Sequence, residues 1–189
     1  MDKQPLLVMF VGVPGSGKSY FGRQLAERLG GVWLNNDSMR LAIWGSREEV
    51  RKTHVDVDER AKGNAMVFGA MNYAASRILV AGTTVIYDSN ANGRRERAGM
   101  QQLAADSQAL AVVIRIKTPF AIALQRGQER EETDDQRQLT EAKMREVIER
   151  HGAEIDEPGA DENVIEMSGE IAFDDQYESF QRQLLAIHR

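Results

Sequence analysis

The feature that most constrains this chain is the segment from Gly12 to Ser19, which reads GVPGSGKS. It fills every position of the pattern G-x-x-x-x-G-K-[ST], in which glycines let several main-chain amides turn toward one phosphate. The unbroken apolar run 6–11 before it is typical of a strand covered on both faces, and residues 18–29 after it have a helical apolar face. The sequence therefore predicts a phosphate-binding loop (P-loop) between a strand and a helix.

Apolar runs alternate with helix-like stretches along the rest of the chain. Further strands are expected at 32–34, 83–87, 110–116 and 163–167, and further helices at 57–80, 94–105, 141–150 and 175–187. Thr118 and Pro119 are typical of a helix start, with Thr118 as N-cap. This alternation predicts an α/β fold with a five-stranded, mostly parallel sheet and helices on both faces. With the P-loop after the first strand, the predicted fold resembles the P-loop NTPase three-layer sandwich.

We expect residues 1–189 to form a single domain, in which the charged stretch at about 127–140 is an exposed, mobile lid. The chain contains no cysteine, which excludes a disulfide framework and thiolate metal sites. No apolar run approaches the roughly 20 residues that span a bilayer, and the N-terminus lacks the layout of a signal peptide. A cytoplasmic protein without membrane contact is therefore expected.

The net charge of −5 is unevenly distributed, because residues 154–189 carry ten acidic and two basic side chains. The remaining body is slightly basic, so it could hold an anionic substrate. The acidic total argues against non-specific binding of long nucleic acid. It is compatible with a short or single-ended nucleic-acid substrate.

The P-loop predicts that the chain binds a nucleoside triphosphate with Mg²⁺. Lys18 can reach the outer phosphates, and the Ser19 hydroxyl can ligate Mg²⁺. The expected nucleotide contacts are Gly12, Val13, Pro14, Gly15, Ser16, Gly17, Lys18, Ser19 and Tyr20. The chain has no guanine-selecting N-K-x-D segment and no LSGGQ-like signature, which argues against a regulatory GTPase and a transporter ATPase. A small kinase remains, with ATP as the expected donor, although GTP stays open.

Two carboxylates follow predicted strands, at the sheet edge where ligands of such folds bind. Asp37, after the second strand, could orient an acceptor hydroxyl and take its proton, or it could be a helix N-cap. Arg40 could hold an acidic group of the acceptor or lie solvated on a helix. Asp88, after the third strand, could act on Mg²⁺ through water, contact the acceptor, or bond local amides in a turn. We assign Asn90, and also Arg95, to the same acceptor-side wall.

Arg126 and Arg130 are four residues apart on a predicted helix and so share a face. Arginines leading into a lid can neutralise charge on a transferred phosphoryl group, which is the role predicted here, with exposed ion pairing as the alternative. His151 and the two other histidines lack metal-ligand spacing and receive no functional role.

Three segments after the P-loop carry a resemblance to a known group. Asn35, Asp37 and Arg40 fit N-x-D-x-x-R, residues 88–92 fit D-[ST]-N-x-N, and the two arginines follow the fourth strand. Over roughly the first 150 residues the chain resembles the P-loop kinases that include the kinase domain of phage polynucleotide kinase, the zeta toxins and related small kinases. The resemblance implies transfer of the γ-phosphate of ATP to a hydroxyl, with Asp37 as general base, Arg40 on an acceptor phosphate and Arg130 on the transferred group.

The leading acceptor is the 5′-hydroxyl of a nucleic acid. A small molecule, sugar or nucleotide sugar is the alternative acceptor, as in zeta-toxin-like kinases and in gluconate or antibiotic kinases. This alternative stays open because the predicted covering segment is rich in acidic residues, which would repel a polyanion. A nucleotide-binding regulator without acceptor chemistry is the alternative of another class. The sequence leaves the oligomeric state open.

Overall fold

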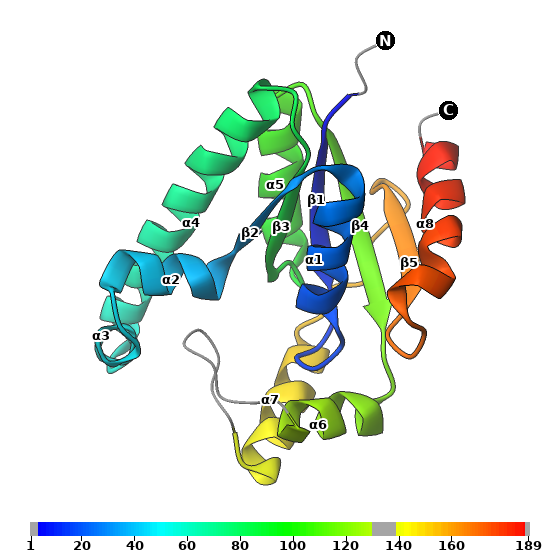
Figure 1. The fold of residues 1–189 in the computed structure, drawn as a ribbon. Coiled ribbons are helices and arrows are strands. Elements are labelled where there is room, and N and C mark those ends of the chain that lie inside the picture. Colours follow the sequence, from blue (N-terminus) through cyan, green and yellow to red (C-terminus); the bar gives the residue numbers. More distant parts are fainter. Residues whose placement is uncertain (1–3, 130–138, 188–189) are drawn as a thin grey trace.

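The computed structural model describes residues 4–129 and 139–187, which form one α/β sandwich (Figure 1). In chain order the elements are β1 (Leu6–Val11), α1 (Lys18–Leu29), β2 (Val32–Asn35), α2 (Asn36–Trp44), α3 (Arg47–Lys52), α4 (Val57–Val80), β3 (Val85–Asn90), α5 (Arg94–Asp106), β4 (Leu110–Lys117), α6 (Phe120–Glu129), α7 (Glu141–Ala153), β5 (Val164–Ser168) and α8 (Phe173–Ile187).

The five strands form one sheet in the order β2-β3-β1-β4-β5, and every neighbouring pair is parallel. All carboxyl ends therefore meet at one edge, where polar side chains from the loop after β1 and from the ends of β2 and β3 come together. The predicted fold class is confirmed, and the sheet is wholly parallel. All six residues of β1, the central strand, are buried, which explains why its sequence is an unbroken apolar run.

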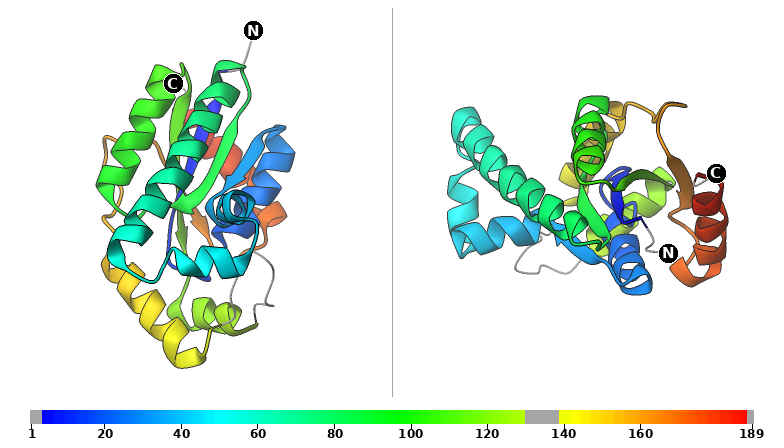
Figure 2. Two further views of the ribbon diagram at one scale, coloured as in Figure 1. Left: turned by 90° about the vertical axis from the view of Figure 1, so that its left-hand side faces the viewer. Right: turned by 90° about the horizontal axis from the view of Figure 1, so that it is seen from above.

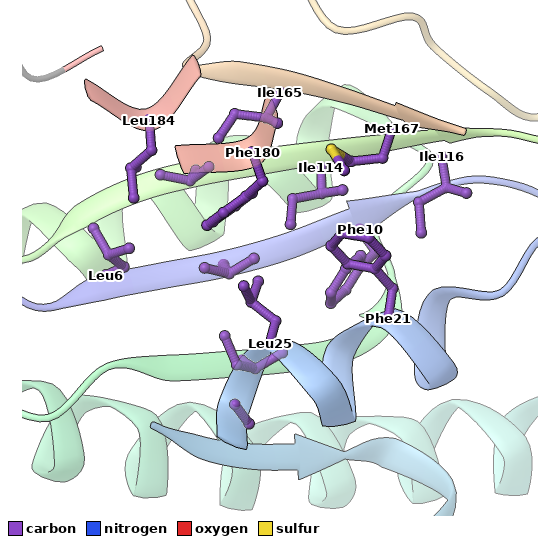
Figure 3. Close-up of a cluster of buried hydrophobic side chains, with 14 of the residues drawn as sticks. Leu6, Phe10, Phe21, Leu25, Ile114, Ile116, Ile165, Met167, Phe180 and Leu184 are labelled. Atoms are coloured by element: carbon purple, nitrogen blue, oxygen red, sulfur yellow. The ribbon is translucent and has the colours of Figure 1, made fainter. Parts of the chain in front are cut away.

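Helices cover both faces of the sheet. The α1 and α8 helices pack on one face and α4 and α5 on the other, as the two turned views show (Figure 2). On the α1 face, Phe10 of β1 and Phe21 of α1 lie in a cluster that extends to Phe180 of α8 (Figure 3). The opposite cluster places Met71 of α4 against Tyr87 of β3 and its neighbours. These clusters hold the strand ends in place.

The remaining helices lie at or beyond the carboxyl edge (Figure 1). The α6 and α7 helices pack together through Ala123, Leu124, Met144 and Ile148. The α2 and α3 helices extend beyond the edge strand β2, and α2 contacts α4. Within the described residues, no helix has the length and apolar character needed to cross a membrane.

Three local expectations need correction. The helix α3 was not predicted, because its six residues include five charged ones and so lack an apolar face. Strand β3 runs through Asp88 to Asn90 rather than ending before Asp88, because it continues to pair with β1 as far as Phe10. Thr118 does not cap α6: its hydroxyl donates to the Ser16 carbonyl at 3.0 Å and so ties β4 to the P-loop.

The predicted lid at 127–140 is only partly visible. Residues 127–129 belong to α6, with Gly127 buried, and Thr140 is the N-cap of α7. The intervening 130–138 lie outside the described residues, so the lid and the single-domain boundary stay predictions.

Candidate functional site

A cavity of about 360 Å³ lies at the carboxyl edge of the sheet, over the P-loop. We call it the P-loop cavity. Its walls come from residues 14–20, from the end of β2 with the start of α2, and from the end of β3. Arg126 of α6 and His151 of α7 complete it. The structure therefore joins segments that are far apart in the sequence into one polar site.

The P-loop cavity is built to hold an anion at the start of α1. Gly17, the N-cap of α1, makes no side-chain capping bond, and the first turn of the helix carries no acidic residue. The amides and the positive end of the helix dipole at the start of α1 are thus left for an anion, because no carboxylate of the first turn competes for them. Ser16 is fully buried, and its Oγ has no partner among the described residues. These features fit the phosphates of a nucleotide.

The side chain of Lys18 runs toward the start of the P-loop. Its Nζ donates to the carbonyl oxygens of Gly12 at 2.7 Å and Val13 at 2.9 Å. These bonds place the ammonium group inside the loop, beside the anion site. A cation held there can contact phosphate oxygens with little further movement.

Gly15 has two separate reasons to be glycine. Its φ of +80° lies in the left-handed region, and a Cβ would come within 2.2 Å of the Ala123 carbonyl oxygen of α6. We expect Gly15→Ala to lower the affinity for Mg-ATP about tenfold or more, since left-handed strain alone costs about 1–2 kcal/mol. Isothermal calorimetry gives the affinity, and urea unfolding gives the stability.

Gly69→Ala is the matched control for this variant. Gly69 lies inside α4, and a Cβ there would meet nothing within 4 Å. That change should stabilise the fold by about 0.5–1 kcal/mol and leave the Mg-ATP affinity unaltered. Unchanged affinity in Gly15→Ala would show that the P-loop moves freely against α6.

Asp88 lines the P-loop cavity and is fixed by two hydrogen bonds. Its side chain is 3% exposed, and its Oδ2 accepts bonds from Trp33 Nε1 at 3.1 Å and Asn35 Nδ2 at 2.9 Å. Because both donors use Oδ2, Oδ1 has no hydrogen-bond partner among the described residues and is left for a metal ion, a water molecule or a ligand. Both donors come from β2, so the reading of Asp88 as a turn carboxylate bonded to local amides is wrong.

Asp37 lines the same cavity from the first turn of α2. The predicted alternative, an N-cap role, belongs instead to Asn35, whose Oδ1 accepts from the Ser38 amide at 2.9 Å. Asn35 thus caps α2 with its oxygen and holds Asp88 with its nitrogen. One side chain therefore sets the positions of both carboxylates.

Arg40 is half-buried one turn further along α2, and so it is not a solvated helix residue. Its Nη2 donates to Asn64 Oδ1 of α4 at 2.6 Å, while its buried Nη1 has no partner among the described residues. Burial lowers the pKa of Arg40, Asp37 acts in the opposite direction, and Arg60 lowers it further. An incoming anion would relieve this unfavourable burial. Arg40 does not line the P-loop cavity itself.

His151 is a site residue that the sequence reading missed. It lines the P-loop cavity at the end of α7, and its Nδ1 lies 3.2 Å from Asn90 Nδ2. Burial lowers the pKa of His151, the largest of several influences on it. Glu154 Oε2 also lies 3.4 Å from Nδ1, so the tautomer decides whether Nδ1 accepts from Asn90 or donates to Glu154. No local pattern marks this histidine, because its neighbour Asn90 is 61 residues away.

A second cavity, of about 380 Å³, continues from the P-loop cavity around residues 168–172; we call it the 168–172 cavity. Ser16, Gly17, Tyr20 and Arg126 line both. Arg126 Nη1 donates to the Gly169 carbonyl at 2.6 Å, so this arginine joins α6 to the loop before α8. The residues of that loop form no recognisable motif, and the sequence analysis did not select them.

A buried ion pair outside the P-loop cavity is linked by hydrogen bonds to the start of the P-loop. Arg97 of α5 is fully buried and pairs with Glu162 through Nε at 2.7 Å and Nη2 at 3.1 Å. Its Nη1 donates to the Ala91 carbonyl at 3.1 Å and the Asn92 carbonyl at 2.8 Å. Asn92 Oδ1 in turn accepts from the Gly12 amide at 3.0 Å. The pair therefore positions the first residue of the P-loop.

Most of the predicted site residues converge. The P-loop cavity holds the loop residues 14–19 with Tyr20, and also Asp37, Asp88, Asn90 and Arg126. Arg95 lines a different cavity, between α4 and α5. Arg130 lies outside the described residues, so its predicted role stays a prediction.

A family model described as an AAA domain matches residues 7–153. A search among curated proteins finds no match to the sequence.

Solved structures share the fold at low sequence identity. A gluconokinase from Sinorhizobium meliloti has a TM-score of 0.66 at 15% identity, with 98% of this chain and 94% of that chain covered. The APS kinase of Mycobacterium tuberculosis, solved with AMPPNP and APS, has a TM-score of 0.61 at 17% identity, covering 96% and 98%. Kti12 from Chaetomium thermophilum, solved with ADP-AlF3, has a TM-score of 0.67 at 18% identity, covering 97% and 99%. The chain therefore has a P-loop NTPase-like fold, which it shares with structures named as kinases.

Proposed function

The chain belongs to the AAA domain family, and on that premise we propose that it is a kinase that transfers the γ-phosphate of ATP to an acceptor hydroxyl. The observation that carries the proposal is the P-loop cavity, in which an anion site and two carboxylates share one space. A phosphate-binding loop alone needs only the first of these. The two carboxylates supply what an acceptor and a metal ion require.

The nucleotide is assigned across two cavities. The phosphates lie on the P-loop amides with Lys18, and the nucleoside lies in the 168–172 cavity, where Arg126 and Tyr20 border both spaces. Residues 168–172 form the wall of this space that faces the nucleoside. The neighbouring structures solved with AMPPNP and with ADP-AlF3 support a nucleotide on this fold.

Mg²⁺, when bound, would neutralise phosphate charge, and Ser19 and Asp88 are the residues that fit it. Ser19 lies at the start of α1, and Asp88 offers Oδ1, which suits a hard cation or its water. Oxygen ligands of this kind are what Mg²⁺ prefers.

The acceptor hydroxyl is assigned to Asp37. The carboxylate accepts the hydroxyl proton as the acceptor oxygen forms its bond to the γ-phosphorus, and the bond to the leaving ADP breaks. Arg126, which lines the P-loop cavity, is assigned to stabilise charge on the phosphates, and Arg130 is assigned to the same task from the sequence. Arg40 is assigned to an anionic group of the acceptor.

The finer proposal for the acceptor is the 5′-hydroxyl of a nucleic acid. It is supported by the joint occurrence of Asn35, Asp37 and Arg40 with residues 88–92, and by the half-buried guanidinium of Arg40. A small-molecule or sugar acceptor is the second candidate. The neighbours named as gluconokinase and APS kinase favour it, because this chain covers nearly their full length.

Incubation with ATP labelled at the γ-phosphate separates these candidates. The panel contains a 5′-hydroxyl oligonucleotide, its 5′-phosphorylated counterpart, gluconate and a set of nucleosides and sugars. Labelling of the 5′-hydroxyl oligonucleotide alone supports the leading acceptor, and labelling of a sugar alone overturns it. Lys18→Ala should abolish labelling throughout. Tight Mg-ATP binding with no labelled acceptor would favour a nucleotide-binding regulator.

A further inference from the structure

A third cavity, of about 390 Å³, lies between α4 and α5 on the face of the sheet opposite α1. We call it the α4–α5 cavity. It is formed by Phe68 and Asn72 of α4, by the end of β3, and by the first turns of α5 from Arg95 to Met100. The nucleotide assignment makes no use of it.

We propose that the α4–α5 cavity is the subsite for the body of the phosphoryl acceptor, and that it takes a ring compound carrying an anionic group. The inference rests on the proposed kinase function and names where that acceptor lies. The cavity has the size expected of a small-molecule site, at the lower end of the range of about 300–1,000 Å³.

The α4–α5 cavity adjoins the P-loop cavity at the end of β3. Ser89 and Asn90, at the carboxyl end of β3, line both. Asp37 and the P-loop lie on one side of these two residues, and α4 and α5 lie on the other. An acceptor that presents a hydroxyl to Asp37 can therefore extend across the end of β3 into this space.

Hydrogen-bonding groups in the α4–α5 cavity are left for a ligand. Ser89 is 3% exposed, and its buried Oγ has no partner among the described residues, an unfavourable state for a hydroxyl. Tyr87 donates its hydroxyl proton to Asn72 Oδ1 at 2.6 Å, and burial raises the pKa of Tyr87, which keeps that proton in place. The amide nitrogen of Asn72 is thereby left as a donor toward a ligand.

The charge at the rim points to an anion. Three arginines stand at the start of α5: Arg94 pairs with Asp161 at 2.8 Å, Arg97 pairs with Glu162 at 2.7 Å, and Arg95 pairs with no carboxylate in the part of the chain that is described. Glu96 also lines the cavity, but its carboxylate lies against the backbone of Gly93 at the helix N-terminus. Arg95 is thus the cation that an acceptor anion can meet.

The apolar part of the wall suits a ring. Phe68 packs at the edge of the cluster that contains Met100 and Tyr87, and all three border the cavity. Gly99 completes this wall, and a Cβ on Gly99 would meet nothing within 4 Å. Apolar side chains next to hydrogen-bond donors and one cation favour a heterocycle with an acidic substituent over a neutral sugar.

The test measures binding of defined probes by calorimetry, with saturating Mg-ADP present so that the P-loop is occupied. The probes are adenosine 3′-monophosphate, adenosine and gluconate. Adenosine 3′-monophosphate should bind about tenfold or more tightly than adenosine, the gain expected from a charge-assisted hydrogen bond. Arg95→Gln should remove this difference, and Ser89→Ala should weaken both nucleoside probes.

Gly99→Leu tests the cavity by filling it. The new side chain projects into open space, so it should fold normally and weaken both nucleoside probes about tenfold or more. Arg94→Gln controls for loss of a neighbouring arginine, and Gly69→Leu, at another exposed helical glycine with open space around it, controls for added bulk. Both controls, and the ADP affinity of Arg95→Gln and Gly99→Leu, should match the parent protein.

The outcomes separate this inference from the kinase function. Phosphoryl transfer to an acceptor whose KM is the same in Arg95→Gln and Gly99→Leu would overturn the subsite and leave the kinase function standing. Gluconate binding that exceeds that of adenosine 3′-monophosphate and resists Gly99→Leu would overturn the ring requirement. The expected binding pattern without transfer to any acceptor supports the subsite and contradicts the kinase function alone.

Discussion

Asp37→Ala should lower the turnover of phosphoryl transfer by about 10²–10⁴-fold while leaving the Mg-ATP affinity unchanged, if Asp37 is the general base. The carboxylate lines the P-loop cavity from the first turn of α2, whereas the proposed phosphate site lies at the start of α1. Its removal therefore affects proton transfer from the acceptor, and leaves the amides that hold the phosphates in place. Initial rates at saturating ATP give the turnover, and calorimetry with a non-hydrolysable ATP analogue gives the affinity.

Asp37→Asn separates the loss of the base from the loss of a side chain, because the amide keeps the size but accepts no proton. It should be as slow as Asp37→Ala. Asp175→Ala is the matched control, since Asp175 is also an acidic residue in the first turn of a helix, α8, away from the cavity. Normal turnover in Asp37→Ala would remove the residue from the catalytic set. Loss of analogue binding would assign it to the nucleotide instead.

The P-loop and the strands on either side of the site could be predicted because their signals are local. Gly12 to Ser19 is a contiguous motif, and the apolar run of β1 reports burial of a central strand without reference to any partner. The order of the strands then brings Asp37 and Asp88 to one edge, as the rule for parallel sheets predicts. The places of the P-loop, Asp37 and Asp88 in the fold could thus be predicted from the sequence.

The side-chain contacts that position the candidate site residues could not be predicted from the sequence in this way. Asn35 caps α2 and also fixes Asp88, 53 residues away, and the second role depends on the register between β2 and β3. His151 reaches the P-loop cavity only because α7 packs on α6. Such contacts follow from tertiary packing, so a sequence pattern supplies candidates and the fold decides between them.

Arg97 is the strongest example of this limit, because its sequence neighbourhood shows only three arginines with no way to rank them. The structure leaves Arg94 and Arg95 exposed and buries Arg97 completely. We expect Arg97→Met to reduce the free energy of unfolding by about 3–5 kcal/mol, because it leaves the buried Glu162 carboxylate without its partner. Urea unfolding monitored by circular dichroism measures the change.

Two further variants distinguish the buried pair from a general loss of charge. Arg94→Met breaks an exposed pair with Asp161 and should cost about 0–1 kcal/mol. Combining Arg97→Met with Glu162→Leu removes both buried charges and should recover much of the loss in the single variant. A double variant as unstable as Arg97→Met would show that the bonds to the Ala91 and Asn92 carbonyls, rather than the ion pair, carry the effect.

Acid provides an independent readout of the same pair. Burial opposes ionisation of Glu162, but the hydrogen bonds from Arg97 and from the Gly159 amide outweigh it and lower the pKa of the carboxyl. A carboxyl with a lowered pKa in the folded state stabilises the protein above its ordinary pKa of about 4.3, and this stabilisation is lost as the pH falls below that value. The parent protein should therefore lose stability more steeply on acidification than Arg97→Met does, as measured by urea unfolding between neutral pH and pH ~3. Parallel acid profiles for the two proteins would contradict a charged Glu162 as the partner of Arg97.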